Sequence, residues 1–420
     1  MSQSFLWRKG PALAACLIFA FFALTYFPAN SVYRNTMLFL GNKAYWTPFL
    51  DTDTVLSAVR CLRADVDAYV FNPCDPQLRV FTYSPLWMSL TALPVTEAWV
   101  IWMGLVWVLL YLGAMFLLPV VRSRNAMVLT ILGTASSASI YAMERGNNDI
   151  VIFALVSVAA VLLTRQGAAR RLGYGAVLLA GLLKYYPLGV MMVALRETPR
   201  RFLTIAAISL AITLLAIWVT WDDLIRVLKS IPVGPFFTDM FGAKSTGLAL
   251  VGIFHLPKWV EPATRAVLSL GALAVGLKIG LGPRLHADLV RLTERERSFL
   301  LVGSLMVCLC YFSAQNIGYR SINLILVLPA LTALIELTGA RLYKWTTGAI
   351  IALLWVGAWR LYWEGGVMAD ADFFAPKRYV ALAVRDLLWW GMIPVLVGTL
   401  VALLRDGPLP QAVLRRVGLA

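Results

Sequence analysis

The chain has 420 residues, of which 60% are hydrophobic and only 14% carry a charged side chain. Soluble domains carry about 25% charged residues, so this composition excludes an ordinary water-soluble exterior. The net charge is +15. The basic residues fall in short segments between apolar runs, which is typical of membrane proteins and argues against nucleic-acid binding.

The apolar runs are about 15–25 residues long, which matches the hydrocarbon thickness of a bilayer. Backbone in lipid must satisfy its own hydrogen bonds, and these runs do not alternate as barrel strands do. The sequence therefore predicts an all-α, polytopic membrane bundle of roughly ten to twelve membrane helices, short broken or re-entrant ones included. A single domain is expected to cover 1–420.

The first apolar run, about 11–28, is expected to be an uncleaved anchor, because many further spans follow it. The later spans are expected near 97–121, 126–143, 149–165, 202–219, 262–281, 298–313, 320–338, 346–360 and 386–404. The loops expected on the external side are 29–80, 144–149, 220–261, 314–319 and 361–385.

Segment 172–195 is ambiguous because Lys184-Tyr-Tyr-Pro187 interrupts it in the middle. A single span here would place the arginines at 196–201 outside. A re-entrant hairpin keeps the basic segments on both sides of it in the cytoplasm, as the positive-inside rule requires. We therefore predict a hairpin, with the N-terminus and the C-terminus both cytoplasmic.

Two acids, Asp51 and Asp53, lie in the first external loop, and Tyr83 follows later in the same polar region. A carboxylate at a membrane surface can remove a proton from a hydroxyl group, as a general base does. The alternative is an ordinary solvated acidic loop.

The turn at 144–149 contains Glu144, Asn147 and Asn148 between two apolar runs. Such a concentration of polar groups suggests the wall of a polar cavity. Alternatively, Asn148 or Asp149 only caps the following helix.

Two cations lie close to membrane depth, where charge is costly and therefore a candidate for function. Lys184 needs an anionic partner, either a protein carboxylate or a ligand phosphate, and Tyr186 follows it. Arg320, preceded by Tyr319, suits phosphate because its planar fork donates two parallel hydrogen bonds. Interfacial anchoring by Tyr319 and Arg320 is the alternative.

Cys61 and Cys74 share the first external loop, where oxidation is possible. We predict a disulfide between them, which stabilises by about 3 kcal/mol in the chain-entropy model; two unpaired thiols are the alternative. The two histidines, His255 and His286, are far apart, and no metal or cofactor is expected.

The motifs form an ordered set along about 50–330. In chain order they are Asp51, Asn-Pro-Cys-Asp (72–75), Tyr-Ser-Pro (83–85), Glu-Arg-Gly-Asn (144–147), Leu-Lys-x-Tyr-Pro (183–187) and Tyr-Arg (319–320). This set resembles the polyprenyl-phosphate-dependent glycosyltransferases of the GT-C superfamily, and most closely glycosyltransferase family 87, which includes bacterial mannosyltransferases. One departure is Val55, where the family often has an aromatic residue.

The resemblance implies a multi-span enzyme of the bacterial plasma membrane with its active site on the external side. It implies a sugar donor on a polyprenyl phosphate, a lipid or glycan acceptor, and Asp51, or else Asp53, as the base. Lys184 and Arg320 are then expected at the donor phosphate. Tyr83, Glu144, Asn147, Asn148, Tyr186 and Tyr319 are expected to line the substrate cavity.

A transporter or lipid flippase is the main competing hypothesis, because broken helices and buried charge also mark transport sites. Against it, the chain shows no repeat of two related halves, and its polar motifs concentrate on one side of the membrane. Another membrane enzyme and a structural protein are further alternatives.

Overall fold

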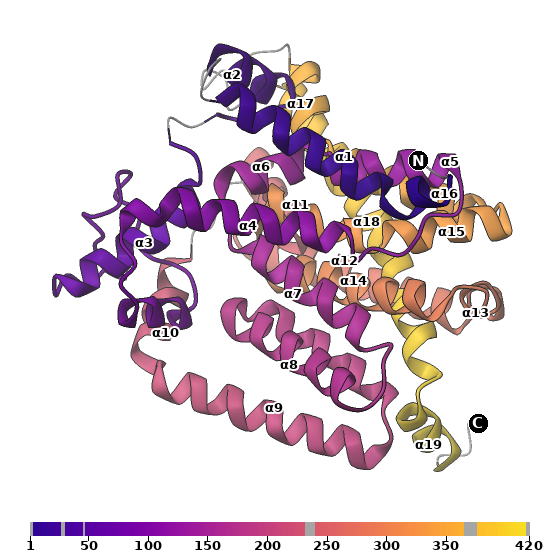
Figure 1. The fold of residues 1–420 in the computed structure, drawn as a ribbon. Coiled ribbons are helices and arrows are strands. Elements are labelled where there is room, and N and C mark those ends of the chain that lie inside the picture. Colours follow the sequence, from indigo (N-terminus) through magenta and orange to yellow (C-terminus); the bar gives the residue numbers. More distant parts are fainter. Residues whose placement is uncertain (1–2, 27–29, 45–46, 232–239, 365–375, 417–420) are drawn as a thin grey trace.

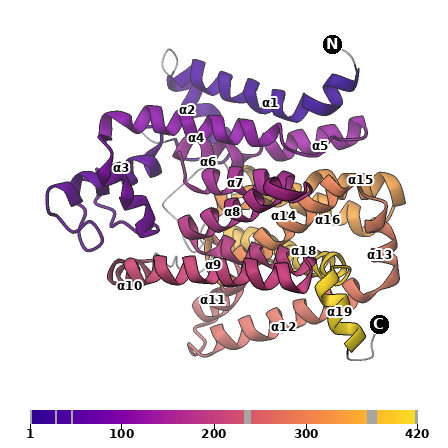
Figure 2. The same cartoon turned by 60° about the horizontal axis from the view of Figure 1, so that its bottom comes forward.

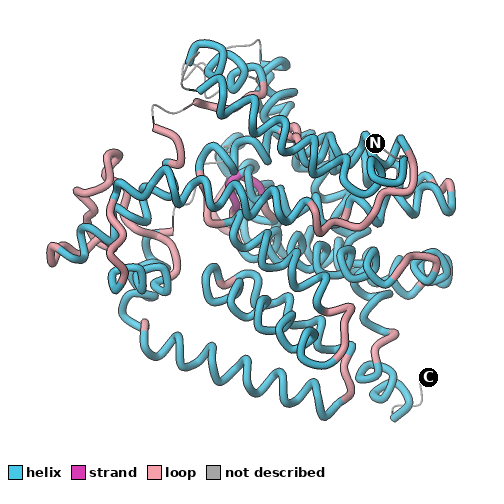
Figure 3. Tube along the Cα trace, viewed as in Figure 1, coloured by secondary structure: helices cyan, strands magenta, loops and turns pink. Residues whose placement is uncertain are grey.

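The computed structural model describes residues 3–26, 30–44, 47–231, 240–364 and 376–416. Parts of three predicted external loops, at 29, 45–46, 232–239 and 365–375, lie outside the described residues. Within the described ranges the regular structure is helical apart from one pair of two-residue strands, and loops connect the helices (Figure 3). This confirms the prediction of an all-α bundle.

Seven helices among the described residues are long and apolar enough to cross a membrane, or eight if a pair bent by 49° counts as one span. The corresponding elements are α1 (Gln3–Tyr26), η2 (Glu97–Trp99) with α4 (Val100–Met115), α5 (Arg124–Thr134) with α6 (Ser137–Arg145), α9 (Pro199–Val219), α12 (Val260–Leu281), α14 (Glu294–Ser313), α18 (Pro376–Arg405) and the bent pair η4 (Gly318–Leu326) and α15 (Leu328–Thr338). The expectation of roughly ten to twelve also counted short helices.

Three shorter apolar helices are α7 (Asp149–Leu162), η3 (Tyr186–Arg196) and α11 (Ala243–Phe254). The remaining elements are α2 (Asn30–Phe39), α3 (Leu50–Arg63), η1 (Pro85–Ala92), α8 (Gly167–Lys184), α10 (Trp221–Ser230), β1 (Met240–Phe241), α13 (Pro283–Val290), β2 (Asn316–Ile317), α16 (Arg341–Leu354), α17 (Val356–Glu364) and α19 (Pro408–Arg416). The strands pair antiparallel, with Met240 opposite Ile317.

The helices differ sharply in how much of their surface the protein covers. Within the most apolar window of α14, 78% of the residues are buried, whereas none are buried in that of α9. In Figures 1 and 2, α1 and α9 lie on opposite sides of the bundle, with α7 and α14 between them. Since α9 is strongly apolar and uncovered, lipid is its natural neighbour.

The bundle has two polar ends, and α14 connects them. Near its start, Glu296 accepts from Arg122 at 2.5 Å, while Asn316 and Arg320 follow its end. A helix of 20 residues spans about 30 Å, which is the thickness of the hydrocarbon core. We call these ends the Arg122 end and the Asp51 end. The start of α1 lies with α13 and α19 at the Arg122 end (Figure 1).

The hairpin expected in 172–195 is present as α8 followed by η3. The chain turns at Tyr185, whose φ is 35°, and Arg170 at the start of α8 pairs with Glu197 just after η3. The basic segments before and after the hairpin therefore meet at the Arg122 end. Lys184, at the turn of the hairpin, lies near the Asp51 end.

The first predicted external loop is largely structured. Its α3 carries Cys61, which forms a disulfide with Cys74 (Cα–Cα 5.8 Å). The side chain of Arg63 donates to the backbone carbonyl of Val95 at 2.5 Å, which ties α3 to the segment before α4. The disulfide closes the loop that follows α3, and the Arg63 contact holds α3 against the segment that leads into α4.

Two helix boundaries differ clearly from the predicted spans. The span expected at 97–121 ends at Met115. The expected span 386–404 belongs to a longer helix, α18, which begins at Pro376 within the predicted loop 361–385. Arg385 and Asp386 suggested a boundary because charge is costly in a span. In the structure they pair at 2.9 Å, and Asp386 also accepts from Thr246 at 3.1 Å. The helix can therefore continue through both residues.

Candidate functional site

The first half of the site is built around Asp51 in the first turn of α3. A carboxylate is favourable there because it faces the positive end of the helix dipole. Only 2% of Asp51 is exposed. Its Oδ1 pairs with Arg145 and lies 3.5 Å from Nη1 of Arg79, and its Oδ2 accepts from Nδ2 of Asn147 at 2.5 Å. Both oxygens are therefore engaged by residues far away in the sequence.

The turn between α6 and α7 reaches Asp51 through a glycine. Gly146 ends α6 with a φ of 55°, which favours glycine because the residue has no Cβ. A Cβ here would also meet Oγ1 of Thr52 at 2.5 Å, and that hydroxyl donates to the Gly146 carbonyl at 2.7 Å. The glycine lets the two backbones approach, which brings Arg145 and Asn147 to the carboxylate.

The second half of the site is built around Asp149, whose side chain is fully buried. Its Oδ2 accepts from Nζ of Lys184 at 2.6 Å and from Nε of Arg320 at 3.2 Å. Its Oδ1 accepts from the hydroxyl of Tyr186 at 3.0 Å. The predicted convergence of Lys184 and Arg320 on one anion thus occurs, and the anion in the structure is a protein carboxylate.

The two halves differ in charge balance. Around Asp51, the acids Asp51 and Asp75 balance Arg79 and Arg145, two against two. In the direct ion pairs around Asp149, two cations face one carboxylate, which is a surplus of one positive charge, and Asp51 of the other half also attracts Lys184. The side chains of Lys184 and Arg320 are only 11% and 21% exposed, and a buried charge without compensation is expensive. The second half can therefore bind an additional anion.

Aromatic side chains join the two halves. Nζ of Lys184 lies 5.5 Å from the centre of the Tyr83 ring, a distance typical of a cation–π contact. The ring of Tyr319 lies 5.9 Å from that of Tyr141. The neighbouring Ser84 donates to the carbonyl of Leu182 at 2.7 Å, so the predicted Tyr-Ser-Pro motif fixes the Tyr83 segment to the hairpin turn.

Asp53 has different neighbours from Asp51, because residues two positions apart point to different sides of a helix. It is 9% exposed and accepts from Ser57 at 3.3 Å. Burial, and then the nearby Asp75 carboxylate, raise the pKa of Asp53. No described ion pair involves Asp53, whereas Asp51 pairs with Arg79 and Arg145 and attracts Lys184 electrostatically.

Asn147 and Asn148 have separate roles in the turn. Oδ1 of Asn147 accepts from the backbone N–H of Asp149 at 2.8 Å, so Asn147, rather than Asn148 or Asp149, provides the cap for α7. Asn148 is 1% exposed, and within the described protein neither end of its amide has a hydrogen-bond partner. A buried amide in this state is costly unless water or a ligand satisfies it.

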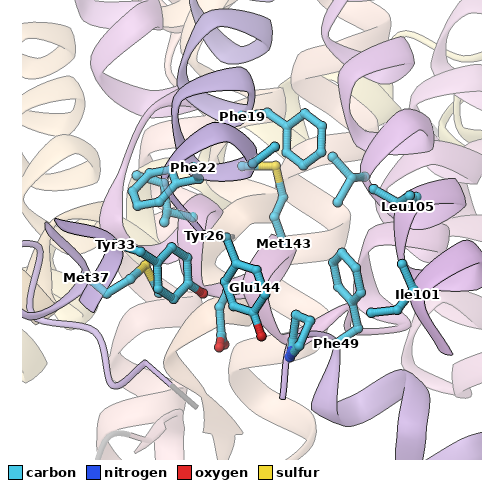
Figure 4. Close-up of a pocket in the computed structure, with 14 residues that line it drawn as sticks. Phe19, Phe22, Tyr26, Tyr33, Met37, Phe49, Ile101, Leu105, Met143 and Glu144 are labelled. Carbon is cyan, nitrogen blue, oxygen red and sulfur yellow. The ribbon is translucent and has the colours of Figure 1, made fainter. Parts of the chain in front are cut away.

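An apolar pocket of about 120 Å³ lies beside the site, between α1, α2, α4 and α6. Figure 4 shows the carboxylate of Glu144 beside the hydroxyls of Tyr26 and Tyr33, with side chains such as Phe19 and Leu105 around the remaining space. Burial and the Glu144 carboxylate raise the pKa of Tyr33. Since Glu144 precedes Arg145 in the chain, the pocket adjoins the Asp51 cluster, and it can accept an apolar chain.

Three residues that complete the site were not among the predicted site residues. Arg145 and Asp149 belong to the turn 144–149, whose concentration of polar residues was the available signal. Arg79 carries a weaker signal, since it stands four residues after Asp75, with which it pairs at 2.8 Å. No group of three or more metal-ligating side chains that could hold a metal ion is found within the described ranges.

Comparison with known proteins leaves the function to be argued from the site itself. No protein-family model matches the chain, and no curated protein or solved structure matches it.

Proposed function

We propose that this protein is a membrane glycosyltransferase that moves a sugar from a polyprenyl phosphate to a lipid or glycan acceptor. The main support is the pairing of two groups at one end of the bundle: a buried carboxylate, Asp51, and a buried cationic cluster with surplus charge, Lys184 and Arg320. Acceptor activation needs the first and a phosphate leaving group needs the second.

In the proposed reaction Asp51 takes the proton of the acceptor hydroxyl. The acceptor oxygen bonds to the anomeric carbon, and the bond from that carbon to the phosphate oxygen breaks, leaving its electron pair on the phosphate. Lys184 and Arg320 stabilise the charge that develops, which is a large effect where water is excluded. A single displacement inverts the anomeric configuration. The buried amide of Asn148 is available to a sugar hydroxyl.

Asp51 can meet an acceptor hydroxyl most readily through Oδ2, whose one described hydrogen bond comes from Asn147. The bond from the neutral amide of Asn147 is the weaker one, because the contact with Arg145 joins opposite full charges. We propose that the acceptor hydroxyl replaces the Asn147 amide at Oδ2, while Arg145 stays paired with Oδ1.

The apolar pocket supports a lipid-linked substrate, since an isoprenoid or acyl chain would find apolar side chains directly beside the charged groups. For orientation, we propose the bacterial plasma membrane with the Asp51 end external, because the Arg122 end carries the arginine-rich segments. Cysteine labelling tests this: Asp222→Cys in α10 should react with an impermeant reagent from outside, and Ser123→Cys should not. Strong external labelling of Ser123→Cys would show that the protein has the opposite orientation.

A transporter or flippase is the second candidate, supported by the broken hairpin α8–η3 with its buried Lys184–Asp149 pair. Transport sites lie near the middle of the membrane, whereas the residues described above gather at one end of the bundle. The enzyme proposal explains this one-sided arrangement better.

The decisive experiment offers the purified protein, reconstituted in lipid, a series of radiolabelled polyprenyl-phosphate sugars, each with a membrane glycolipid extract as acceptor. The enzyme proposal expects labelled product with at least one donor and release of polyprenyl phosphate. Movement of donor across proteoliposomes with no new glycosidic bond would reject the enzyme and support transport.

A further inference from the structure

The Arg122 end contains a second charged hollow, which the proposed reaction does not use. It has a volume of about 380 Å³ and lies between the start of α8 and the start of α9. Four arginines line it: Arg170, Arg171, Arg200 and Arg201. The space corresponds to roughly a dozen water molecules, so it can hold a phosphate-sized group.

One buried acid organises this hollow. Glu197 is 5% exposed, pairs with Arg170, and accepts from the hydroxyl of Tyr174 at 2.8 Å. Its other oxygen lies 3.8 Å from Nη1 of Arg201. Glu197 offsets one of the four positive charges and leaves a surplus of three. Two arginines, Arg171 and Arg200, are exposed and are free of the Glu197 network.

The hollow opens beside an apolar surface. Its lining continues onto α9 with Thr204 and Ile205, and farther along α9 apolar side chains such as Leu210 remain 60% exposed. The hollow therefore lies where the basic end of a helix meets its lipid-facing stretch. An anion with attached acyl chains fits both features at once, whereas a free phosphate uses only the arginines.

We infer that this hollow is a binding site for the phosphate headgroup of an anionic phospholipid, whose acyl chains lie along α9. Basic pockets between helices at a membrane surface bind such headgroups. Ordinary orientation by the positive-inside rule also places arginines here, but that rule requires only charge near the membrane and predicts no preference among the arginines of this end.

The test compares two variants that remove the same charge from the same end. Arg171→Gln/Arg200→Gln alters the hollow without touching the Glu197 pairs. Arg284→Gln/Arg291→Gln alters two exposed arginines in and just after α13, outside the hollow. Native mass spectrometry of detergent-purified protein would measure the binding of dioleoyl phosphatidylglycerol, dioleoyl phosphatidylcholine and inorganic phosphate.

The wild type should bind its first phosphatidylglycerol more tightly than phosphatidylcholine. Each basic residue near an anionic lipid contributes roughly a factor of five, so the hollow variant should bind about 30-fold more weakly, with the α13 variant unchanged. The single variant Arg200→Gln, expected to weaken binding about fivefold, serves if the double variant does not fold. Equal loss in the α13 variant, no preference over phosphatidylcholine, or equally tight binding of inorganic phosphate would each overturn the inference.

Discussion

The two ends of the bundle handle charge in opposite ways. At the Asp51 end, acids and bases from distant segments pair in buried positions, as Asp51 does with Arg145 and Asp149 with Lys184. At the Arg122 end, arginines outnumber acids and several remain exposed, as Arg171 and Arg200 do. Exposed charge at a membrane surface costs little and orients the chain, whereas a buried pair rarely repays the loss of its hydration.

The exposed arginines of the Arg122 end are explained by membrane topology, whereas the buried pairs of the Asp51 end call for a chemical role. Replacing a buried ion pair by apolar residues of similar volume is often neutral or stabilising. Two adjacent buried clusters are therefore poorly explained by stability alone. The cluster with unequal charge, two cations on Asp149, is the place where a ligand would complete the balance.

The largest expected effect is on catalysis, at Asp51. Asp51→Asn preserves size and removes the proton acceptor, so transfer should fall about 10²–10⁴-fold. Binding of the donor should survive, because its proposed phosphate contacts are Lys184 and Arg320. Single-turnover transfer together with donor binding, both on reconstituted protein, would measure the two effects separately.

The matched control is Asp75→Asn. Asp75 is 1% exposed and also pairs with Arg79, but no described contact joins it to the Asp149 cluster. Loss of a buried carboxylate should reduce stability in both variants, whereas only Asp51→Asn should lower transfer per folded molecule by about 10²–10⁴-fold. Equal transfer by the two variants would show that Asp51 is not the catalytic base.

The next effect is on stability, at Asp149. Asp149→Asn leaves Lys184 and Arg320 without their shared carboxylate, and breaking a buried pair in this way costs about 3–5 kcal/mol. Thermal unfolding in detergent should therefore begin at a much lower temperature. Inorganic phosphate should raise the midpoint more in this variant than in the wild type, since an anion that binds only the folded state stabilises it.

Asp67→Asn is the control for Asp149. Asp67 and its partner Arg226 are 41% and 45% exposed, and an exposed pair contributes at most about 1 kcal/mol. Comparable unfolding midpoints for the two variants would mean that loss of the Asp149 carboxylate does not leave costly unpaired charge at Lys184 and Arg320.

Much of the fold could be predicted from the sequence, because the apolar runs that mark membrane spans and the basic segments that set orientation do not depend on how the helices pack. The break at Lys184–Pro187 could be predicted for the same reason, since proline and charge interrupt an apolar helix. The pairing of Asp51 with Arg145 was not readable, because it depends on how α3 packs against α6. Arg79 was missed because a loop rich in acids resembles a solvated loop. The start of α18 was predicted too late because Arg385 and Asp386 neutralise each other only in the folded protein.

A smaller effect is expected at the disulfide. Cys61→Ser/Cys74→Ser should lower the free energy of unfolding by about 3 kcal/mol in the chain-entropy model. The loop that carries Arg79 should loosen, so transfer should weaken without being lost. Non-reducing mass spectrometry first establishes the bond in the wild type. Free thiols at both positions there, or unchanged stability of the variant, would contradict the prediction.

The smallest effect is expected at Asp53, and it should depend on pH. Burial and Asp75 raise the folded-state pKa of Asp53, so its protonated form is the one that the fold favours. Its contribution is then fully present below the unfolded pKa, near 4, and is lost as the pH rises through the higher folded value. Asp53→Asn imitates the protonated acid, so it should be slightly more stable than the wild type at pH 7 and equal to it at low pH. Transfer should be nearly normal. Chemical denaturation at several pH values would measure this difference, with Asp65→Asn, at an exposed residue after α3, as the control for loss of a surface carboxylate. If instead Asp53→Asn abolished transfer while Asp51→Asn did not, the base would be Asp53. The donor phosphate would then have to lie near the side of α3 that carries Asp53.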